Sequence, residues 1–398
     1  MHIVLLSTYG FDPHFPSRPE FVLARTLAEM GHTVSAIEYW HNQEYPQEQR
    51  FQANLTIYRC RTLGFFSRDL ATLVKRLPAI DIVHVHHLRH LMAYQAQFHW
   101  RGRIPMCLTP HGMLHDGDLV VDRERPLEHP LTPERLIFTK REVARRLFHF
   151  QHVRRTLRNY LIHAPLLRYD GHLALSHHER GVLIDLGVPA ETVTVVANAV
   201  DVSQYVASRG SAKARRPTVL FIGQLIPRKG WDLAIETVAR LRQSIPDIRL
   251  QMITHNTSEM AALQDLIRTH DLHAHVEIHT RVDETQKVAM LSQAHVLLAP
   301  SRYEGFGIPP IEAMAAECPV VTTDCAAGNE VVQHEQTGLL VPYDDVQGFA
   351  DAIQRLLSNP ELRNRLIANG RIHVGETFHP KHIATKTLDA YQHIMSLP

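Results

Sequence analysis

The chain has 398 residues, of which 44% are hydrophobic and 21% are charged. This composition excludes a disordered polymer, and the length is too great for one ordinary hydrophobic core, so two domains are expected. Lys and Arg number 42 against 41 Asp and Glu, a formal net charge of +1. That balance gives no electrostatic reason to expect a nucleic acid as partner. No run of about 18 apolar residues predicts a transmembrane helix.

The chain opens on a predicted buried strand at residues 3–7. The first seven residues, Met-His-Ile-Val-Leu-Leu-Ser, have no basic region before the apolar run and so do not predict a signal peptide. A Pro-rich loop at 12–19 leads to a helix at 20–30, which Gly31 ends. Further strands are predicted from the apolar runs at 33–38, 55–58, 82–85 and 106–109. Strands that alternate with helices predict a parallel, doubly wound α/β sheet.

Two residue types raise the question of special chemistry in this half. The 29 histidines include His84, His86, His87 and His90, and strand alternation would place His84 and His86 on one face. Zinc would need a third ligand, which neither a cysteine nor a His-Glu-x-x-His helix supplies, so no bound metal is expected. The four cysteines form no Cys-x-x-Cys pair, which favours reduced thiols in a cytoplasmic protein. They are Cys60, Cys107, Cys318 and Cys325.

Residues 115–170 interrupt the strand–helix alternation. Basic residues recur among apolar ones between 135 and 168, a pattern that predicts a helical basic insertion. One interpretation is a solvated helical face. The others are a peripheral contact with anionic lipid at the inner face of the membrane, or a cradle for a phosphorylated acceptor.

A second α/β unit begins near residue 217. Strands are predicted at 218–222, 250–254, 276–279, 296–299 and 320–323, with a helix at 231–243. The polar, weakly periodic segment 201–216 is interpreted as a linker between the two units. The last helix is predicted at 380–395.

The first segment with candidate chemistry is 221–230. A predicted strand ends at Gly223, and a helix begins after Gly230. In open α/β sheets, ligands bind beyond the carboxyl ends of strands. Arg228 offers forked hydrogen bonds and Lys229 a point charge, a pair that suits a diphosphate. An exposed basic turn is the alternative interpretation.

The second segment, 299–312, also joins a buried strand to a helix. Gly305 and Gly307 permit close approach of a ligand to the backbone, and Pro309 and Pro310 suit the first turn of a helix. The positive end of that helix would attract a phosphate group.

The same segment carries two carboxylates, Glu304 before the helix and Glu312 in its expected first turn. They could accept hydrogen bonds from the hydroxyls of one elongated ligand. Otherwise, Glu312 compensates the helix dipole and Glu304 is a surface charge.

The spacing of Glu304 and Glu312, with the 223–230 segment upstream, closely resembles glycosyltransferase family 4, which has the GT-B fold. Residues 186–189 and 195–201 resemble the interdomain crossover of that family, and 330–332 and 337–341 resemble its late segment. Pro110-His111-Gly112 resembles its donor-facing loop. The likeness is specific over nearly the whole C-terminal half and is mostly one of pattern in the N-terminal half.

The resemblance implies two Rossmann-like domains that face each other across a cleft. They would be an acceptor domain at 1–200 and a donor domain at 217–378, with a crossover helix at 379–398. It also implies retaining transfer of a hexosyl group from a nucleoside-diphosphate sugar, UDP- or GDP-linked, to a hydroxyl acceptor. That acceptor would be a polysaccharide, a glycolipid or a small-molecule glycoside. The family usually needs no bound metal, and no cofactor is expected.

Residue roles follow from the same resemblance. Arg228 and Lys229 would hold the donor diphosphate, and Glu304 would lie near the transferred sugar. Glu312 would accept hydrogen bonds from the ribose, and His111 would contact the sugar. The other donor-binding positions are Gly10, Gly223, Arg281, Val282, Gly305, Phe306, Gly307 and Ile308.

Two positions depart from the family pattern. The usual Gly-Gly pair after the first strand is replaced by Ser7-Thr8-Tyr9-Gly10, and Ala199 stands where glycine is common. We expect Gly10 to serve in part and Arg18 to supply a charge contact. A sugar-nucleotide-binding protein without transferase activity and a nucleotide-sugar epimerase are the alternatives. A hydride-transferring enzyme is disfavoured because no Gly-x-Gly-x-x-Gly follows the first strand.

Overall fold

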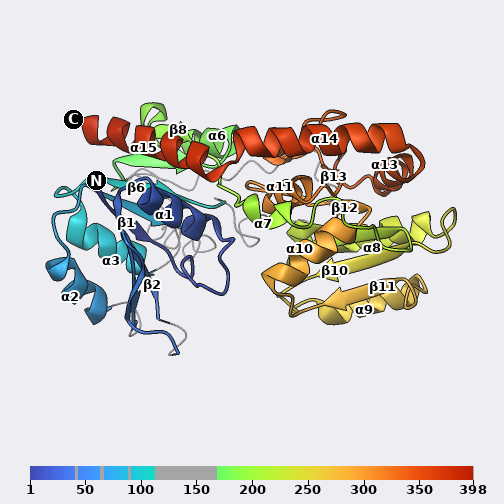
Figure 1. Ribbon diagram of the computed structural model, residues 1–398, viewed down its shortest axis with the longest axis horizontal. Helices are drawn as coiled ribbons and strands as arrows, with labels where there is room; N and C mark the ends of the chain where they lie inside the picture. Colours follow the sequence, from blue (N-terminus) through green and yellow to red (C-terminus); the bar gives the residue numbers. More distant parts are fainter. Residues whose placement is uncertain (41–43, 63–66, 88–90, 113–167, 398) are drawn as a thin grey trace, which may run out of the picture. The chain divides into compact units, whose positions relative to one another are not determined.

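The computed structural model describes residues 1–40, 44–62, 67–87, 91–112 and 168–397 (Figure 1). These residues form two compact units. The first contains the described residues up to 199 together with the C-terminal segment from Pro380, and the second contains 200–379. The predicted basic insertion and His90 lie outside the described residues.

The first unit is built on an eight-stranded sheet of order β3-β4-β2-β1-β5-β6-β7-β8. All neighbouring strands are parallel except β3 and β4. Its elements are β1 (His2–Leu6), α1 (Pro19–Glu29), β2 (Thr33–Tyr39), β3 (Glu48–Gln52), β4 (Leu55–Cys60), α2 (Arg68–Arg76), β5 (Ile82–His86), α3 (Leu91–Trp100), β6 (Met106–Thr109), β7 (Gly171–Ala174), α6 (His177–Asp185), β8 (Val193–Val195) and α15 (Pro380–Ser396).

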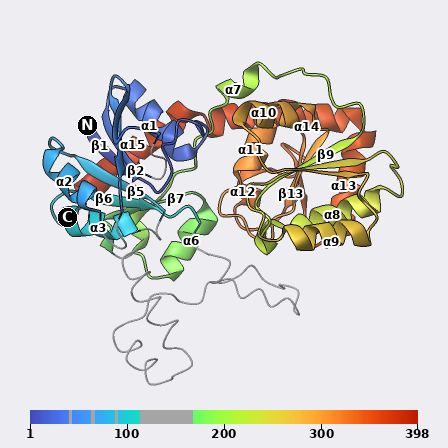
Figure 2. The ribbon, with the colours of Figure 1, turned by 90° about the horizontal axis from the view of Figure 1, so that it is seen from below.

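The C-terminal helix α15 is part of the core of this unit. It packs against α1 and β7, as Figure 2 shows for α1. Tyr391 and Ile394 are buried in the same cluster as Phe21 and Leu27 of α1. Gly171 allows the close approach to β7, since a Cβ there would lie 2.4 Å from the Ile394 side chain. The last helix therefore stabilises the unit formed by the start of the chain.

The second unit is built on a six-stranded parallel sheet of order β11-β10-β9-β12-β13-β14. Its elements are α7 (Ser203–Val206), β9 (Thr218–Ile222), η4 (Pro227–Lys229), α8 (Trp231–Leu241), β10 (Arg249–Ile253), α9 (Met260–Thr269), β11 (Val276–His279), α10 (Glu284–Gln293), β12 (Val296–Ala299), α11 (Ile308–Ala315), β13 (Val320–Thr323), α12 (Gly328–Val331), β14 (Leu339–Val341), α13 (Val346–Ser358) and α14 (Pro360–Thr377).

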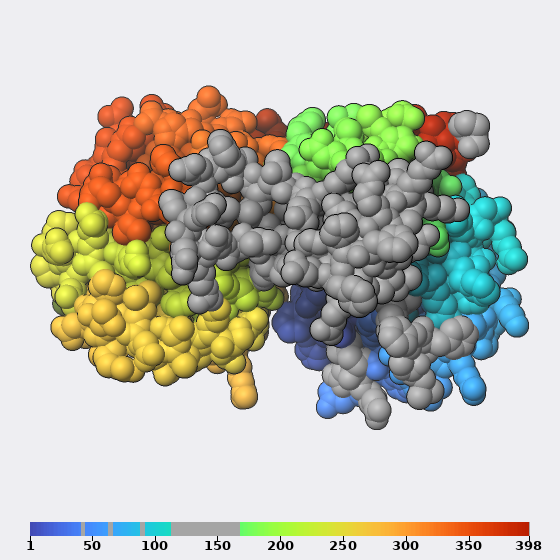
Figure 3. All heavy atoms as spheres, turned by 180° about the vertical axis from the view of Figure 1, so that it is seen from behind, coloured from blue at the N-terminus to red at the C-terminus, as the bar shows by residue number. Residues whose placement is uncertain are grey.

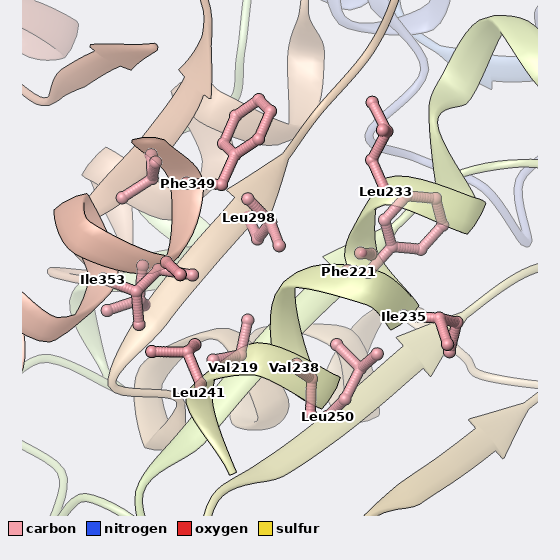
Figure 4. Close-up of a cluster of buried hydrophobic side chains, with 14 of the residues drawn as sticks. Val219, Phe221, Leu233, Ile235, Val238, Leu241, Leu250, Leu298, Phe349 and Ile353 are labelled. Carbon is pink, nitrogen blue, oxygen red and sulfur yellow. The ribbon is translucent and has the colours of Figure 1, made fainter. Parts of the chain in front are cut away.

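The core of the second unit lies where α8 and α13 meet the sheet. Val238 and Leu241 of α8 and Phe349 of α13 are buried with strand residues such as Val219 and Leu298 (Figure 4). On the surface, the segments from β9 to α10 and from β12 onwards adjoin in the coloured part of Figure 3. The sheet thus unites sequence-distant segments in one compact unit.

In both sheets, the order in which the chain adds strands reverses at the first strand. The chain leaves β9 towards β10 and β11 and returns to β12 on the other side of β9, and β1 lies in the same way between β2 and β5. Such a switch point opens a crevice at the carboxyl ends of the two central strands, where α/β proteins bind ligands. The loops after β9 and β12 carry the two predicted segments, so the topology brings them together.

The predicted parallel α/β class is confirmed by these two sheets. Two local predictions need correction. Residues 201–216 include the helix α7, with Tyr205 fully buried, and are not only a linker. The antiparallel strand β3 was not predicted, because Glu48–Gln52 is a mostly exposed edge strand without apolar alternation. No helix among the described residues is long and apolar enough to cross a membrane.

Candidate functional site

The turn after β9 depends on a glycine. Pro227–Lys229 forms a short 3₁₀ helix, and Gly230, with φ of 64°, is the N-cap of α8. A Cβ at Gly230 would lie 2.0 Å from the carbonyl oxygen of Pro300. Only glycine therefore lets this basic turn pack against the loop after β12.

We expect Gly230→Ala to destabilise the protein by about 2 kcal/mol or more, because it adds a backbone clash to an unfavourable φ. Gly375→Ala is the matched control, since Gly375 lies in α14 and a Cβ there would meet nothing within 4 Å. It should leave stability unchanged or raise it by up to about 1 kcal/mol. Urea unfolding of both variants measures the difference, and equal stabilities would contradict the expectation.

Arg302 ties this turn to its surroundings. Its guanidinium donates to both carboxylate oxygens of Asp232, at 2.8 and 2.7 Å, and to Asp344 Oδ1 at 2.9 Å. It also donates to the carbonyl of Pro227 at 3.0 Å, and the Arg302 amide donates to the carbonyl of Arg228 at 2.8 Å. The two carboxylates outweigh the cost of burial and raise the pKa of Arg302 above its usual value. No role of Arg302 could be predicted from the sequence, because its partners are distant in the chain.

Lys229 and Glu304 form an ion pair across the two loops. Lys229 Nζ donates to Glu304 Oε2 at 2.6 Å, and Ser301 Oγ donates to the same oxygen at 3.3 Å. Both side chains of the ion pair are largely buried. Burial alone would raise the pKa of Glu304, but the charge and hydrogen bond of Lys229, followed by the charge of Arg228, lower it overall. Glu304 is therefore an ionised hydrogen-bond acceptor held by a cation.

The glycine loop after Glu304 leads into α11. Gly307, with φ of 98°, is the N-cap of this helix, and no side chain caps it. The first amides of a helix lack partners within the helix. Pro309 and Pro310 have no amide hydrogen, so the amides of Gly307 and Ile308 are the ones here that can receive an anion. Phe306 is buried and lies edge-to-face with Phe378, and the amide of Ala327 donates to the carbonyl of Glu304 at 3.2 Å. The loop is thus held on both sides.

Glu312 lies further into the helix than predicted. Because α11 begins at Ile308 and has no acid in its first turn, Glu312 lies beyond that turn. It is buried and accepts from Lys287 Nζ at 2.7 Å, and Lys287 also lies 2.9 Å from Glu284 Oε2. Burial acts to lower the pKa of Lys287, but Glu312 and then Glu284 raise it overall.

The remaining predicted positions of the second unit lie on the same edge of its sheet. Gly223 directly follows β9, and a Cβ there would lie 3.0 Å from the Phe221 ring and 3.6 Å from Lys229 Cβ. Arg281 and Val282 follow β11, immediately before Asp283, which caps α10 with a capping box. The structure thus places these residues around the carboxyl ends of β9, β11 and β12.

In the first unit, His111 occupies the corresponding edge. Strand β6 ends at Thr109, and His111 follows it after Pro110, with a φ of 56°. The amide of the adjacent Gly112 donates to Glu179 Oε1 at 2.9 Å, and the Leu175 amide donates to Glu179 Oε2 at 2.6 Å. Burial raises the pKa of Glu179 to about 7, although the two amide hydrogen bonds act in the opposite direction. Glu179 therefore anchors the loop that carries His111.

His111 belongs to a partly buried cluster with Glu20, His86 and His87. His111 Nε2 and His86 Nδ1 share a hydrogen bond of 2.9 Å, and His87 Nε2 donates to Glu20 Oε1 at 2.8 Å. Glu20 Oε1 lies 3.8 Å from His111 Nε2. Burial would raise the pKa of Glu20, but His111 and His87 lower it to about 2. Burial and then His87 lower the pKa of His111 to about 3.

The structure brings together three side chains that could bind a metal ion. Ligand atoms of Glu20, His87 and His111 all lie within 4.8 Å of one another, so these three could hold a metal ion. Sequence reasoning missed this group because Glu20 and His111 are distant from His87 in the chain, and the expectation that no metal is bound stays a prediction. His84, in contrast, hydrogen-bonds Tyr391 and Thr109 at 2.7 and 2.8 Å.

Gly10 lies next to this cluster. A Cβ at Gly10 would lie 2.7 Å from Ser7 Oγ and 3.0 Å from Glu20 Cβ. The observed reason for glycine at this position is close packing of the first loop against the start of α1.

Below about pH 6.5 we expect stability to fall, because His84 stays neutral in the folded state. Burial, followed by the proximity of His111, lowers its pKa from 6.5 to about 3. The unfolded chain then binds the proton first as the pH falls, so stability present above pH 6.5 is lost towards pH 3. One histidine contributes a loss of about 2 kcal/mol between about pH 6.5 and 5. Urea unfolding measures this loss, which His84→Gln should reduce; an unchanged pH dependence in the variant would contradict the assignment.

Both units match family models. Residues 207–373 match the model described as "Glycosyl transferases group 1", and residues 21–204 match "Glycosyltransferase Family 4". The MMP α-(1→4)-mannosyltransferase of Mycolicibacterium hassiacum is 26% identical over an alignment of 419 positions, gaps included, which covers 98% of each chain. A glycogen synthase of Mycobacterium tuberculosis is 31% identical over 204 residues. The match covers 50% of this chain and 48% of the synthase, so the chain spans about half the length of that relative.

Solved structures show the same fold. Sucrose-phosphate synthase from Thermosynechococcus elongatus has a TM-score of 0.74 at 21% identity, with 98% of each chain covered. Anabaena HepE in complex with UDP and glucose has a TM-score of 0.71 at 16% identity, with 98% of this chain and 99% of that chain covered. With two parallel α/β units and a family model matched by each, the chain belongs to glycosyltransferase family 4, with the GT-B fold.

Proposed function

We propose that this protein is a retaining glycosyltransferase that moves a hexosyl group from a nucleoside-diphosphate sugar to a hydroxyl acceptor, without a metal ion or cofactor. One observation carries the proposal. Lys229 and Glu304 meet at 2.6 Å, with Arg228 adjacent in the chain, where the carboxyl ends of β9 and β12 define the switch point. Cations for a diphosphate and an ionised acceptor for sugar hydroxyls thus share one edge of the sheet.

The chemistry needs charge stabilisation more than a nucleophile. When the anomeric bond breaks, its electron pair leaves with the diphosphate oxygen, and Arg228, Lys229 and the start of α11 stabilise that charge. The acceptor oxygen bonds to the anomeric carbon on the face the diphosphate leaves. The departing phosphate oxygen takes the acceptor proton, so atoms and charge balance. Glu304 accepts hydrogen bonds from the transferred sugar. We propose that His111 also contacts this sugar.

Donor and acceptor are proposed by class. The HepE complex contains UDP and glucose, and the name of the M. hassiacum relative specifies mannosyl transfer. We therefore propose a UDP- or GDP-linked hexose as donor. A polysaccharide, a glycolipid or a small-molecule glycoside is the acceptor class.

We propose a cytoplasmic enzyme that contacts the membrane surface through residues 135–168. If replacing the arginines of residues 135–168 leaves liposome co-sedimentation unchanged, that contact is contradicted.

Thermal unfolding with UDP, GDP, ADP and dTDP tests the donor site. The correct diphosphate at 100 times its Kd should add about 2.7 kcal/mol of stability. The double substitution Arg228→Ala/Lys229→Ala should abolish the added stability. If no diphosphate stabilises the wild type, the proposed donor site is wrong.

Turnover assays separate transfer from the alternatives. The donors are sugars linked to the nucleoside diphosphate that stabilises the protein, and they are tested with a panel of hydroxyl acceptors. We expect the product to be a glycoside with the anomeric configuration of the donor, and we expect EDTA to leave the activity unchanged. Nucleotide binding without turnover would support a binding protein, and a changed sugar nucleotide formed without acceptor would support an epimerase. Inversion, or loss of activity with EDTA, would contradict the proposed mechanism.

A further inference from the structure

Three segments of the first unit bring two histidines to one carboxylate. Glu20 lies in the first turn of α1, His87 directly follows β5, and His111 lies in the loop after β6. Both histidines have a left-handed backbone, with φ of 64° and 56°. This conformation is uncommon outside glycine, and it is worth explaining where it recurs at one site. Two neighbouring loops at the carboxyl edge of the sheet thus each bring a histidine to Glu20.

The distances between these side chains suit a transition-metal ion. His87 Nε2 lies 2.8 Å from Glu20 Oε1, and His111 Nε2 lies 3.8 Å from the same oxygen. A tetrahedral zinc ion lies about 2.0–2.1 Å from its nitrogen and oxygen ligands, which places the ligand atoms about 3.3 Å apart. The two observed distances lie on either side of that value, so small movements of the side chains would complete the site.

An ion can reach the cluster from solvent. The side chains of Glu20 and His111 are only 4% and 9% exposed, whereas that of His87 is 38% exposed and provides an entry path. The ion would replace two hydrogen bonds. His87 would carry its proton on Nδ1, which frees Nε2 from Glu20, and His111 would exchange its hydrogen bond with His86 for the ion.

The ligand set is specific in place and in kind. Among the described residues, these three form the one group of His, Cys, Asp or Glu side chains with ligand atoms close enough to share an ion. The nearby His84 has both ring nitrogens hydrogen-bonded, to Tyr391 and Thr109. Two imidazoles and one carboxylate favour Zn²⁺, Cu²⁺ or Ni²⁺, whereas Mg²⁺ and Ca²⁺ prefer oxygen ligands.

We propose that Glu20, His87 and His111 form an inhibitory site for a divalent transition-metal ion such as Zn²⁺. The transfer reaction proposed above needs no metal ion, so the ion is an inhibitor and not a resident cofactor. The inhibition rests on the proposed function, in which His111 contacts the transferred sugar. A ring nitrogen that binds the ion is no longer available for that contact.

Calorimetric titration with Zn²⁺ tests the site without any measurement of activity. The wild type, His87→Gln and Glu20→Gln are freed of metal with EDTA, which is then removed. We expect each substitution to raise the Kd of the tightest site at least about 10-fold, because even the partners of metal ligands contribute about 10–100-fold. His334→Gln is the matched control, since His334 lies 4.0 Å from Glu335 and belongs to no such group of three within the described part of the chain. It should change the Kd by less than about 2-fold.

Transfer assays with the donor that stabilises the wild type test the inhibition. At ten times its Kd, Zn²⁺ fills about nine-tenths of the sites, so wild-type activity should fall about 10-fold relative to activity in EDTA. His87→Gln, compared with its own activity in EDTA, should lose no more than about 2-fold at the same concentration. Mg²⁺ at that concentration should inhibit neither protein.

Three results would overturn the inference. Equal Zn²⁺ affinity of the wild type and both variants would show that the ion binds elsewhere. A strong near-ultraviolet charge-transfer band with Co²⁺ as the probe would show a thiolate ligand instead. A gain of activity with Zn²⁺ would contradict the inhibition and the metal-independent mechanism together. If no donor supports transfer, the proposed function fails and the inhibition with it, and the titration still decides the metal site. Because His87 is partly exposed, its variant provides the test even if Glu20→Gln does not fold.

Discussion

Lys229→Met is expected to lower kcat/KM for glycosyl transfer by about 10²–10³-fold, the usual effect of removing one group that stabilises developing charge. The lysine is held by Glu304 at 2.6 Å in the turn that Gly230 allows. It is therefore positioned before the donor binds, and no reorganisation is needed as charge develops on the leaving diphosphate. Methionine keeps an unbranched side chain that is one atom shorter, and it removes the charge together with the hydrogen-bond donors of the ammonium group.

The measurement is steady-state kinetics with the donor that stabilises the wild type. A loss mainly in kcat indicates an interaction made in the transition state, and a rise in KM alone would contradict that role. Lys386→Met is the control, because Lys386 is an exposed residue of α15 in the first unit. It should change kcat/KM by less than about 2-fold.

Arg302→Leu is expected to destabilise the protein by about 3–5 kcal/mol, because it leaves the carboxylates of a partly buried ion-pair network without their partner. The Arg302 side chain bonds Asp232, Asp344 and the carbonyl of Pro227 in the basic turn. Its loss should therefore also weaken binding of the nucleoside diphosphate. Thermal unfolding should show a fall in Tm of about 10 °C for a unit of this size.

Two further substitutions define the cause. Arg302→Lys keeps the charge but lacks the planar fork, so we expect an intermediate loss of stability. Arg268→Leu removes an arginine whose pairing with Asp265 is largely exposed to solvent. That loss should be less than about 1 kcal/mol. If Arg268→Leu and Arg302→Leu were equally destabilising, burial of the network would not be the reason.

Several features of this protein could be predicted from the sequence because short-range physics determines them. Strand and helix periodicities predict the two parallel α/β units, and a run of buried strand followed by glycine and a helix marks each loop of the proposed donor site. Arg228, Lys229, Glu304 and Glu312 were found because they lie within such loops in the spacing of a family motif. The polar edge strand β3 and the helix α7 were missed, since neither has an apolar repeat long enough to stand out.

Only the tertiary structure decided which side chains meet. Arg302 and Asp232 are 70 positions apart, and Lys287 and Glu312 are 25 apart. Pairing over such separations leaves no periodic signal, because it depends on strand order and on how neighbouring loops pack. The same holds for Glu20, which lies 67 positions from His87 and still forms a partly buried hydrogen bond with it. The sequence by itself therefore determined the sheets and the charged loops, and the strand order of each sheet decided the ion pairs that hold them in place.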